Sequence, residues 1–144
     1  MIRKGTRQDA ETLARLAFFL WENPGVEELT AEFADLLKCD EAACFLAYHA
    51  DIPVGFAQCQ LRHDYVEGTQ SSPVGYLEGI FVQPEFRHCG LAKQLLRACE
   101  SWARGQGCRE FASDCELANG ASLKFHLHMG FAEANRIICF TKKL

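Results

Sequence analysis

The segment Val82-Gln83-Pro84-Glu85-Phe86-Arg87-His88-Cys89-Gly90-Leu91-Ala92 decides the fold prediction for this sequence. An apolar run ends at Val82, a turn containing Pro84 follows, and an amphipathic pattern begins after Gly90. This order predicts a strand, a turn and a helix. The free N–H groups and the dipole at a helix start attract phosphate, and Gly90 lets the backbone approach closely. Arg87 adds a fixed positive charge, so the segment predicts a phosphate-binding loop.

The loop differs from two better-known phosphate-binding patterns. No Gly-Lys-Ser or Gly-Lys-Thr follows the turn, as a P-loop requires, and the second and third glycines of a dinucleotide fingerprint are absent. A glycine at the start of a helix is also an ordinary cap, so the loop alone leaves both interpretations open.

The hydrophobic patterns on either side of this loop predict the remaining elements. Helical spacing indicates helices from residue 9 to about 21, around residues 29–37, from 90 to about 104 and over 121–128. Strands are predicted over residues 2–4, 44–48, 54–61, 74–82, 110–113 and 136–141. The order βααβββαβαβ mixes hairpins with crossovers, which predicts an α+β fold with a mixed sheet flanked by helices. We expect residues 1–144 to form a single domain.

Composition excludes several classes of protein. The 144 residues carry a net charge of −4, and no apolar run approaches the roughly 20 residues of a membrane span. The N-terminal residues lack the apolar stretch of a secretion signal. We therefore expect a soluble cytoplasmic protein that does not bind membranes. We also expect no binding to nucleic acid, because proteins that bind it usually carry basic patches.

The eight cysteines favour neither disulfides nor a metal site. No pair has CxxC spacing, and the residues are scattered through apolar stretches. They are Cys39, Cys44, Cys59, Cys89, Cys99, Cys108, Cys115 and Cys139. We expect most of them to be reduced, small residues of the buried core.

The segment Arg87 to Ala92 resembles the R-x-x-G-x-G/A pyrophosphate motif of the GNAT N-acetyltransferase superfamily, with Ala92 where the last glycine often stands. Within that superfamily the chain looks like the aminoglycoside 6'-N-acetyltransferases. The segments that carry this second resemblance are residues 62–68, 71–74, 77–84 and 108–114. The resemblance covers essentially the whole chain and implies an enzyme that transfers acetyl from acetyl-CoA to an aminoglycoside 6'-amine, giving antibiotic resistance.

The resemblance also implies where acetyl-CoA, the co-substrate, would bind. The cofactor would lie in a gap between two parallel strands that splay apart at the centre of the sheet. The backbone of Ile80, Phe81 and Val82 would hold the pantetheine arm. The pyrophosphate would be cradled by Arg87, His88, Cys89, Gly90, Leu91 and Ala92. Asn119, near the start of the last helix, matches a further cofactor contact.

Five positions match the acceptor contacts of these enzymes: Trp21, Tyr65, Glu78, Asp114 and Asn135. Carboxylates and a flat aromatic surface suit a polycationic sugar. Trp21 can equally be a core aromatic, and Glu78 can lie on the solvent side of its strand. Asn135 stands where these enzymes have an acidic residue, which removes one charge from the predicted site.

The expected reaction is direct attack of a neutral amine on the thioester, which requires a base. Glu78 is the first candidate and Asp114 the second, and the N–H near Val82 would polarise the thioester carbonyl. His126 occupies the place of the tyrosine that often protonates the CoA thiolate in this superfamily, although a packed helix histidine is the other interpretation. An acetyl-cysteine route lacks a base paired with any cysteine.

Two alternatives remain from the sequence. The enzyme can use another acceptor, such as a polyamine, a small metabolite amine or a peptide N-terminus. A non-catalytic module that senses acyl-CoA would carry the same loop. The resemblance also implies a homodimer.

Overall fold

The structure, a computed structural model, describes all of residues 1–144, and its elements follow the predicted order except at the C-terminal end. The elements are β1 (Ile2–Lys4), η1 (Arg7–Asp9), α1 (Ala10–Ala17), α2 (Val26–Leu36), β2 (Ala42–His49), β3 (Ile52–Arg62), β4 (Val74–Val82), η2 (Pro84–Phe86), α3 (Leu91–Gly105), β5 (Phe111–Ser113) and α4 (Gly120–His128). Five strands form one sheet in the order β1-β2-β3-β4-β5. Only β4 and β5 run parallel, so the predicted mixed sheet is confirmed.

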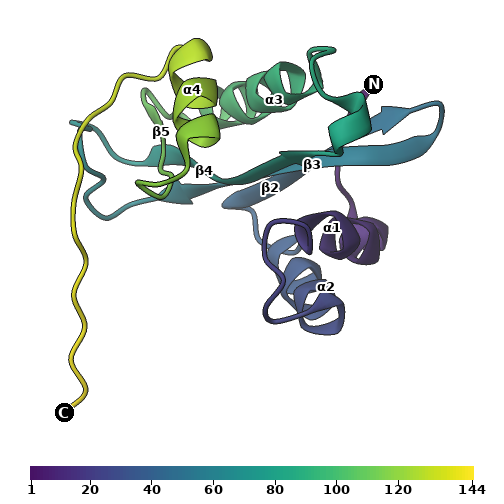
Figure 1. The fold of residues 1–144 in the computed structure, drawn as a ribbon, viewed down its shortest axis with the longest axis horizontal. Helices are drawn as coiled ribbons and strands as arrows, with labels where there is room; N and C mark the ends of the chain where they lie inside the picture. Colours follow the sequence, from purple (N-terminus) through teal and green to yellow (C-terminus); the bar gives the residue numbers. More distant parts are fainter.

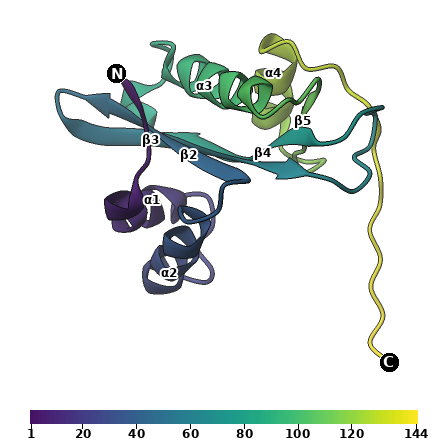
Figure 2. The same ribbon diagram turned by 180° about the vertical axis from the view of Figure 1, so that it is seen from behind.

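The sheet is the middle of three layers. The helices α1 and α2 cover one face, and α3 and α4 cover the other (Figure 1); Figure 2 shows the same layers from behind. Alternate residues of the central strands serve the two faces: Leu46 and Phe56 pack with α1 and α2, whereas Phe45 packs with Leu95 of α3. Both faces are covered, which explains why the strands read as nearly continuous apolar runs. No helix combines the length and the apolar composition needed to cross a membrane.

The parallel pair of strands opens near its middle. Only Gly75, Tyr76 and Leu77 of β4 pair with β5, through Phe111, Ala112 and Ser113. From Glu78 to Val82 the strand β4 continues with β3 alone on one side. The sheet is therefore splayed between β4 and β5, as the resemblance implied.

A β-bulge lies at the residue where the two strands part. Gln58 of β3 is opposite Gly79, and the next residue, Cys59, is opposite Leu77, so Glu78 is an extra residue in β4. Both Glu78 and Gly79 consequently face the layer of α1 and α2: Glu78 lines a cavity with Trp21, and Gly79 packs against the Trp21 ring. Bulges commonly re-aim a side chain in this way beside active sites.

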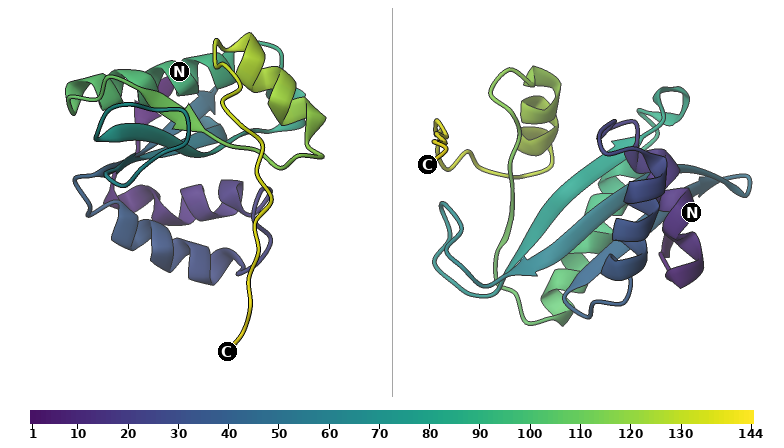
Figure 3. Two further views of the ribbon diagram at one scale, coloured as in Figure 1. Left: turned by 90° about the vertical axis from the view of Figure 1, so that its left-hand side faces the viewer. Right: turned by 90° about the horizontal axis from the view of Figure 1, so that it is seen from below.

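The predicted final strand at residues 136–141 is wrong for this structure. The chain after Gly130 has no regular secondary structure, and Ile137, Ile138 and Phe140 are 70%, 80% and 87% exposed. Figures 1 and 3 show this segment running away from the sheet. The segment has the apolar composition of a strand, but a strand forms only where a neighbouring edge pairs with it.

The cysteine prediction is also partly wrong. All eight thiols are free, but only Cys44, Cys59 and Cys99 are buried. Burial raises the pKa of the Cys44 thiol, which keeps it protonated and inert. The other five lie in loops, at helix starts or on the C-terminal segment, where spacing in the sequence gives no information about burial.

An ion pair fastens the first strand to the first helical turn. The Arg3 guanidinium donates to both oxygens of Asp9, at 2.8 and 2.9 Å, and to the hydroxyl of Tyr48. The Arg3 bonds, with a backbone bond from Thr6, lower the pKa of Asp9 to about 2 despite partial burial. The folded state thus binds the Asp9 proton more weakly than the unfolded chain does.

We predict that Asp9→Asn lowers the free energy of unfolding by about 2 kcal/mol at pH 7. Because the folded pKa is depressed, this stabilisation is complete above the ordinary aspartate pKa and disappears as the pH falls toward 2. Denaturant unfolding of both proteins at pH 7 and pH 3 checks the prediction. An equal stability difference at the two pH values would contradict it.

Candidate active site

The bulged residue Glu78 lines a cavity beside the point where β4 and β5 separate. The cavity has a volume of about 290 Å³ and lies between α2, the end of the α1 region and the sheet. Its lining residues are Trp21, Leu29, Glu32, Phe33, Leu36, Gln58 and Glu78. An indole and two carboxylates thus share one apolar hollow, which suits a cationic ligand with a flat face.

Trp21 fits both of its sequence interpretations. Its ring packs edge-on against Phe56 of the core, with centroids 6.1 Å apart, and it also forms a wall of the cavity. The close packing depends on Gly79, because a Cβ added there would lie 2.5 Å from Cη2 of the indole. A residue without a side chain beside the bulge therefore allows Trp21 to reach the sheet.

Glu78 and Asp114 are connected through two side chains that the sequence interpretation gave no role. Arg62 donates from Nη2 to both oxygens of Glu78, at 2.6 and 3.0 Å, and from Nε to Oε1 at 3.1 Å. The same guanidinium lies 3.4 Å from the centre of the Tyr76 ring. The Tyr76 hydroxyl donates to Asp114 Oδ2. The two candidate carboxylates thus stand at the ends of one continuous set of contacts.

Tyr76 acts in this set as a neutral donor. Burial, followed by the hydrogen bond to Asp114, raises the pKa of its hydroxyl well above the ordinary value. The phenol therefore stays protonated and keeps one lone pair of the exposed Asp114 occupied. Since Asp114 follows β5 directly, this bond also ties the end of β5 to the face of β4.

Tyr65 and Asn135 lie apart from these contacts. Tyr65 is 76% exposed in the loop between β3 and β4, and no hydrogen bond or ring contact holds its side chain. Asn135 donates to Glu67 of the same loop at 3.2 Å and accepts from the Arg136 backbone. Glu133, two residues earlier in the chain, is bound to Arg136. The structure therefore brings Trp21, Glu78 and Asp114 into one region and leaves Tyr65 and Asn135 on neighbouring surface.

The predicted phosphate loop follows β4 and opens α3. Gly90 has φ +84° and caps the helix, and His88 has φ +64°. Left-handed residues next to a helix start can turn backbone N–H groups toward one point, a geometry that suits an anion. Arg87 folds back, donating from Nε to the Val82 carbonyl at 2.7 Å. Residues 87–90 are exposed, so this surface is accessible to a phosphate.

The strand that leads into the loop has one backbone edge free of sheet pairing. Ile80, Phe81 and Val82 pair with Ala57, Phe56 and Gly55 of β3, and β5 has already ended. An extended chain can add to such an edge through backbone hydrogen bonds. The free edge lies between the Glu78 bulge and the phosphate loop, so an extended ligand bound along it would reach both.

His126 links α4 to β5. Its Nδ1 lies 2.7 Å from the Ser122 carbonyl, which accepts, and its Nε2 lies 2.8 Å from Ser113 Oγ. In the neutral ring the proton lies on Nδ1, and Nε2 accepts a hydrogen bond from Ser113. Nε2 therefore has a proton to donate only when the ring is charged. Asn119 has a cap role, because its Oδ1 accepts from the Ser122 N–H at the start of α4.

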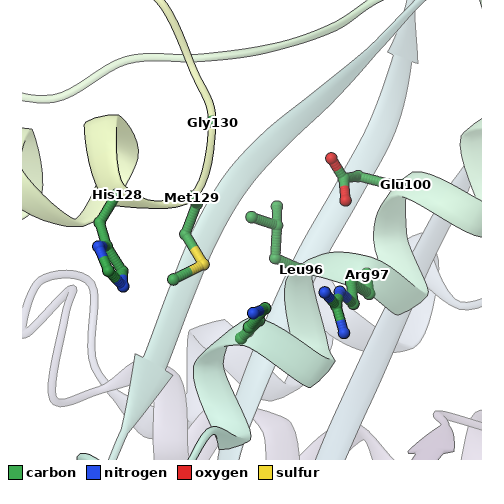
Figure 4. A pocket seen from close by; sticks show the side chains of 7 residues that line it. Leu96, Arg97, Glu100, His128, Met129 and Gly130 are labelled. Atoms are coloured by element: carbon green, nitrogen blue, oxygen red, sulfur yellow. The ribbon is translucent and has the colours of Figure 1, made fainter.

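A second cavity, of about 260 Å³, lies between α3 and α4 (Figure 4). Lys93, Leu96, Arg97, Glu100, His128, Met129 and Gly130 line it. Figure 4 shows His128 and Met129 coming from the α4 side and Arg97 and Glu100 from α3. Its lining has more basic than acidic side chains, so it suits a polycation less well than the Glu78 cavity does.

Sequence reasoning gave no role to Arg62, Tyr76 or Glu32. Tyr76 has the same parity as Glu78 in its strand, two residues apart, which was a usable signal for a shared face. Arg62 lies 16 residues from Glu78, and their contact depends on strand register that no local pattern specifies. Glu32 lies on the exposed side of α2, where a carboxylate is an ordinary solvent-facing residue.

The splayed parallel strands, the free edge of β4 and the phosphate loop at the start of α3 define the class of enzymes that transfer an acyl group from a CoA thioester. The chain belongs to the Acetyltransferase (GNAT) family, whose model matches residues 10–131.

Relatives and solved structures agree along nearly the whole chain. Aminoglycoside N(6')-acetyltransferase type 1 of Stenotrophomonas maltophilia is 44% identical over 146 residues, covering 99% of this chain and 93% of the relative. The Salmonella typhimurium protein of the same name is 41% identical, with 99% and 98% covered. The structure of AAC(6')-Iy in complex with the bisubstrate analogue CoA-S-monomethyl-acetylneamine is 40% identical, with a TM-score of 0.95 and coverage of 100% and 98%.

We predict that Gly79→Ala raises the KM for the acceptor about tenfold, because the added methyl displaces the Trp21 ring from the cavity wall. The KM for acetyl-CoA should change little. Trp21 emission, recorded in a Trp102→Phe background, should shift with the ring. Gly105→Ala is the matched control, because a Cβ there meets nothing within 4 Å. An unchanged acceptor KM together with unchanged emission would contradict the prediction.

Proposed function

We propose that this enzyme transfers the acetyl group of acetyl-CoA to the 6'-amine of aminoglycosides. The observation that carries the proposal is the acidic and aromatic cavity at the Glu78 bulge, directly beside the free edge of β4. The relatives that match almost end to end are aminoglycoside N(6')-acetyltransferases, which supports this acceptor for the present chain. A role in antibiotic resistance is part of the proposal.

The acceptor would lie over the face of the sheet that α1 and α2 leave accessible. Trp21 offers an indole surface to a sugar ring, while Glu78 and Asp114 offer carboxylates to its ammonium groups. Tyr65 and Asn135 would contact more distant parts of the acceptor from the β3–β4 loop and the chain beyond α4. Asn135 would contribute a hydrogen bond without a charge.

Acetyl-CoA would bind along the opening between β4 and β5. The backbone of residues 80–82 would hold the pantetheine arm as an added strand, and residues 87–92 would bind the pyrophosphate. Asn119 is the N-cap of α4, the helix that follows β5 in the chain, and would contact the cofactor while it caps that helix. This arrangement would direct the thioester toward Glu78.

The chemistry would be a direct transfer. A neutral 6'-amine attacks the thioester carbonyl carbon, the N–H near Val82 stabilises the developing oxyanion, and the tetrahedral intermediate collapses with release of the CoA thiolate. Glu78 or Asp114 would accept the amine proton, directly or through water. The charged form of His126 would protonate the thiolate. Cys89 is an unsuitable nucleophile, because its thiol is hydrogen-bonded to the Phe86 carbonyl and no base lies against it.

We predict that purified protein releases CoA thiol from acetyl-CoA when kanamycin is added, and that the rate collapses with an analogue lacking the 6'-amine. A thiol-reactive chromophore follows the release, with spermidine and a short peptide as competing acceptors. Turnover with spermidine or the peptide but not with kanamycin would contradict the aminoglycoside proposal and leave the acetyltransferase class intact. Binding of acetyl-CoA without turnover on any acceptor would favour an acyl-CoA sensor.

We further propose that the enzyme is cytoplasmic and forms a homodimer. The C-terminal segment supports the dimer, because exposed Ile137, Ile138 and Phe140 have a composition typical of a strand and no partner within the chain. Pairing with a second copy would cover these side chains and satisfy the backbone. The free state of all eight cysteines is compatible with a reducing compartment.

We predict that the full chain sediments with twice the mass of one chain and that Ile138→Lys shifts it toward the monomer. The charge would disfavour burial of the segment in a partner. Arg104→Lys, on the exposed side of α3, serves as the control. A wild-type protein that sediments as a monomer at micromolar concentration would contradict the proposal.

A further inference from the structure

Arg62 lies at the end of β3, at the edge of the proposed acceptor site. It is the last residue of β3 and pairs with Val74 at the start of β4, four residues before Glu78. Its side chain is 40% exposed, whereas that of Glu78 is 17% exposed. The guanidinium therefore reaches along the sheet face from the rim of the site toward a carboxylate that is largely withdrawn from solvent.

The bonds between the two side chains are unequal. Oε1 of Glu78 accepts from both Nε and Nη2 of Arg62, while Oε2 accepts only from Nη2, at 3.0 Å. Each carboxylate oxygen can accept two hydrogen bonds. Oε1 is thus fully occupied by Arg62, and Oε2 keeps one free position for another donor.

The ring of Tyr76 holds the Arg62 guanidinium by stacking against it. The guanidinium carbon lies 3.4 Å from the centre of the phenol ring, which is a close stacking contact. The hydroxyl of that ring is bound to Asp114, and its burial holds the ring in place. Arg62 consequently contacts Glu78 and the ring face of Tyr76 directly, and it is connected to Asp114 through the Tyr76 hydroxyl.

We propose that Arg62 is a positioning residue that sets the affinity of the enzyme for its cationic acceptor. It holds Glu78 so that Oε2 faces the acceptor ammonium, and with Tyr76 it fixes the spacing between the carboxylates of Glu78 and Asp114. Arg62 itself does not contact the reacting atoms. The inference rests on the proposed function in that it assumes an amine acceptor, but it does not depend on which amine is used.

The chemistry of the guanidinium explains why arginine serves this role. Nε and Nη2 form a planar pair of donors that grips a carboxylate, and the same plane stacks flat on an aromatic ring. A lysine ammonium supplies the charge, but it has neither the planar pair of donors nor the flat surface that stacks on a ring. In the alternative role, Arg62 would compete with the cationic acceptor for Glu78. Removal of Arg62 would then lower the acceptor KM, whereas the positioning role predicts that it rises.

The experiment compares Arg62→Met and Arg62→Lys with the wild-type enzyme under the same steady-state assay. The positioning role predicts that Arg62→Met raises the acceptor KM about tenfold, and Arg62→Lys about threefold, with a much smaller change in kcat. The KM for acetyl-CoA should stay within about twofold, because the pantetheine edge and the phosphate loop are untouched. Arg104→Met is the matched control for loss of an exposed arginine.

Tyr76→Phe tests the second part of the proposal. The variant keeps the ring under Arg62 and removes the donor to Asp114, so it should raise the acceptor KM less than Arg62→Met does. An acceptor KM that is unchanged or lowered in Arg62→Met would overturn the positioning role, and a lowered value would show competition with the acceptor. Circular dichroism melting and the acetyl-CoA KM detect a variant that fails to fold, in which case Arg62→Lys alone decides.

The proposed function and the positioning role fail in distinguishable ways. The proposed function fails when the wild-type enzyme does not acetylate kanamycin. The positioning role is then measured with whichever amine the wild-type enzyme accepts, and it fails only when the ratio of variant to wild-type acceptor KM is one or below.

Discussion

At Glu78 the ladder between β3 and β4 carries one extra residue, and one residue earlier the pairing of β4 with β5 ends. These two interruptions of the sheet depend on each other. The bulge bends and twists β4, and a strand that bends away from its parallel neighbour cannot continue the ladder. The same distortion exposes an edge for an extended ligand and turns Glu78 and Gly79 to one face. The opening of the sheet and the direction of the acidic side chain thus have one structural origin.

Two side chains of opposite charge, Arg62 and Glu78, lie together on the proposed acceptor face. Glu78 is largely shielded from solvent, and a carboxylate in such a place needs a hydrogen-bonding partner. Arg62 supplies that partner and leaves one oxygen only partly occupied. The remaining acidic groups, Asp114 and Glu32, are exposed and keep the surface attractive to cations. The basic side chains Lys93 and Arg97 lie at the other cavity, beyond the α3 face of the sheet. The acidic lining of the Glu78 cavity and these basic side chains thus lie on opposite sides of the sheet.

The sequence predicted the elements whose signals are local. The bounds of β4 match because a run of nine residues, apolar except for Glu78, ends at a proline turn, and α3 begins where Gly90 predicted it. The candidate residues Trp21, Glu78 and Asp114 fall in one region of the structure. The bulge was not predictable, because it depends on how Gln58 and Cys59 meet β4 across the sheet. The contact of Arg62 with Glu78 follows from that register and was missed for the same reason. The strand at residues 136–141 was predicted from composition alone, although a strand also requires an edge to pair with.

The role of Gly79 shows why a residue with no side chain can matter for specificity here. A methyl group at this position would overlap the end of the Trp21 ring, so the indole can lie against the sheet only when that space is empty. The ring then packs on Phe56 with one edge and leaves its remaining surface to the cavity. Because the core holds the ring, the cavity offers a ligand an aromatic surface that needs no ordering on binding, which lowers the entropic cost of recognition. The bulge thus determines both the polar and the aromatic lining of the Glu78 cavity, since Glu78 and Gly79 are turned to the same face by the same extra residue.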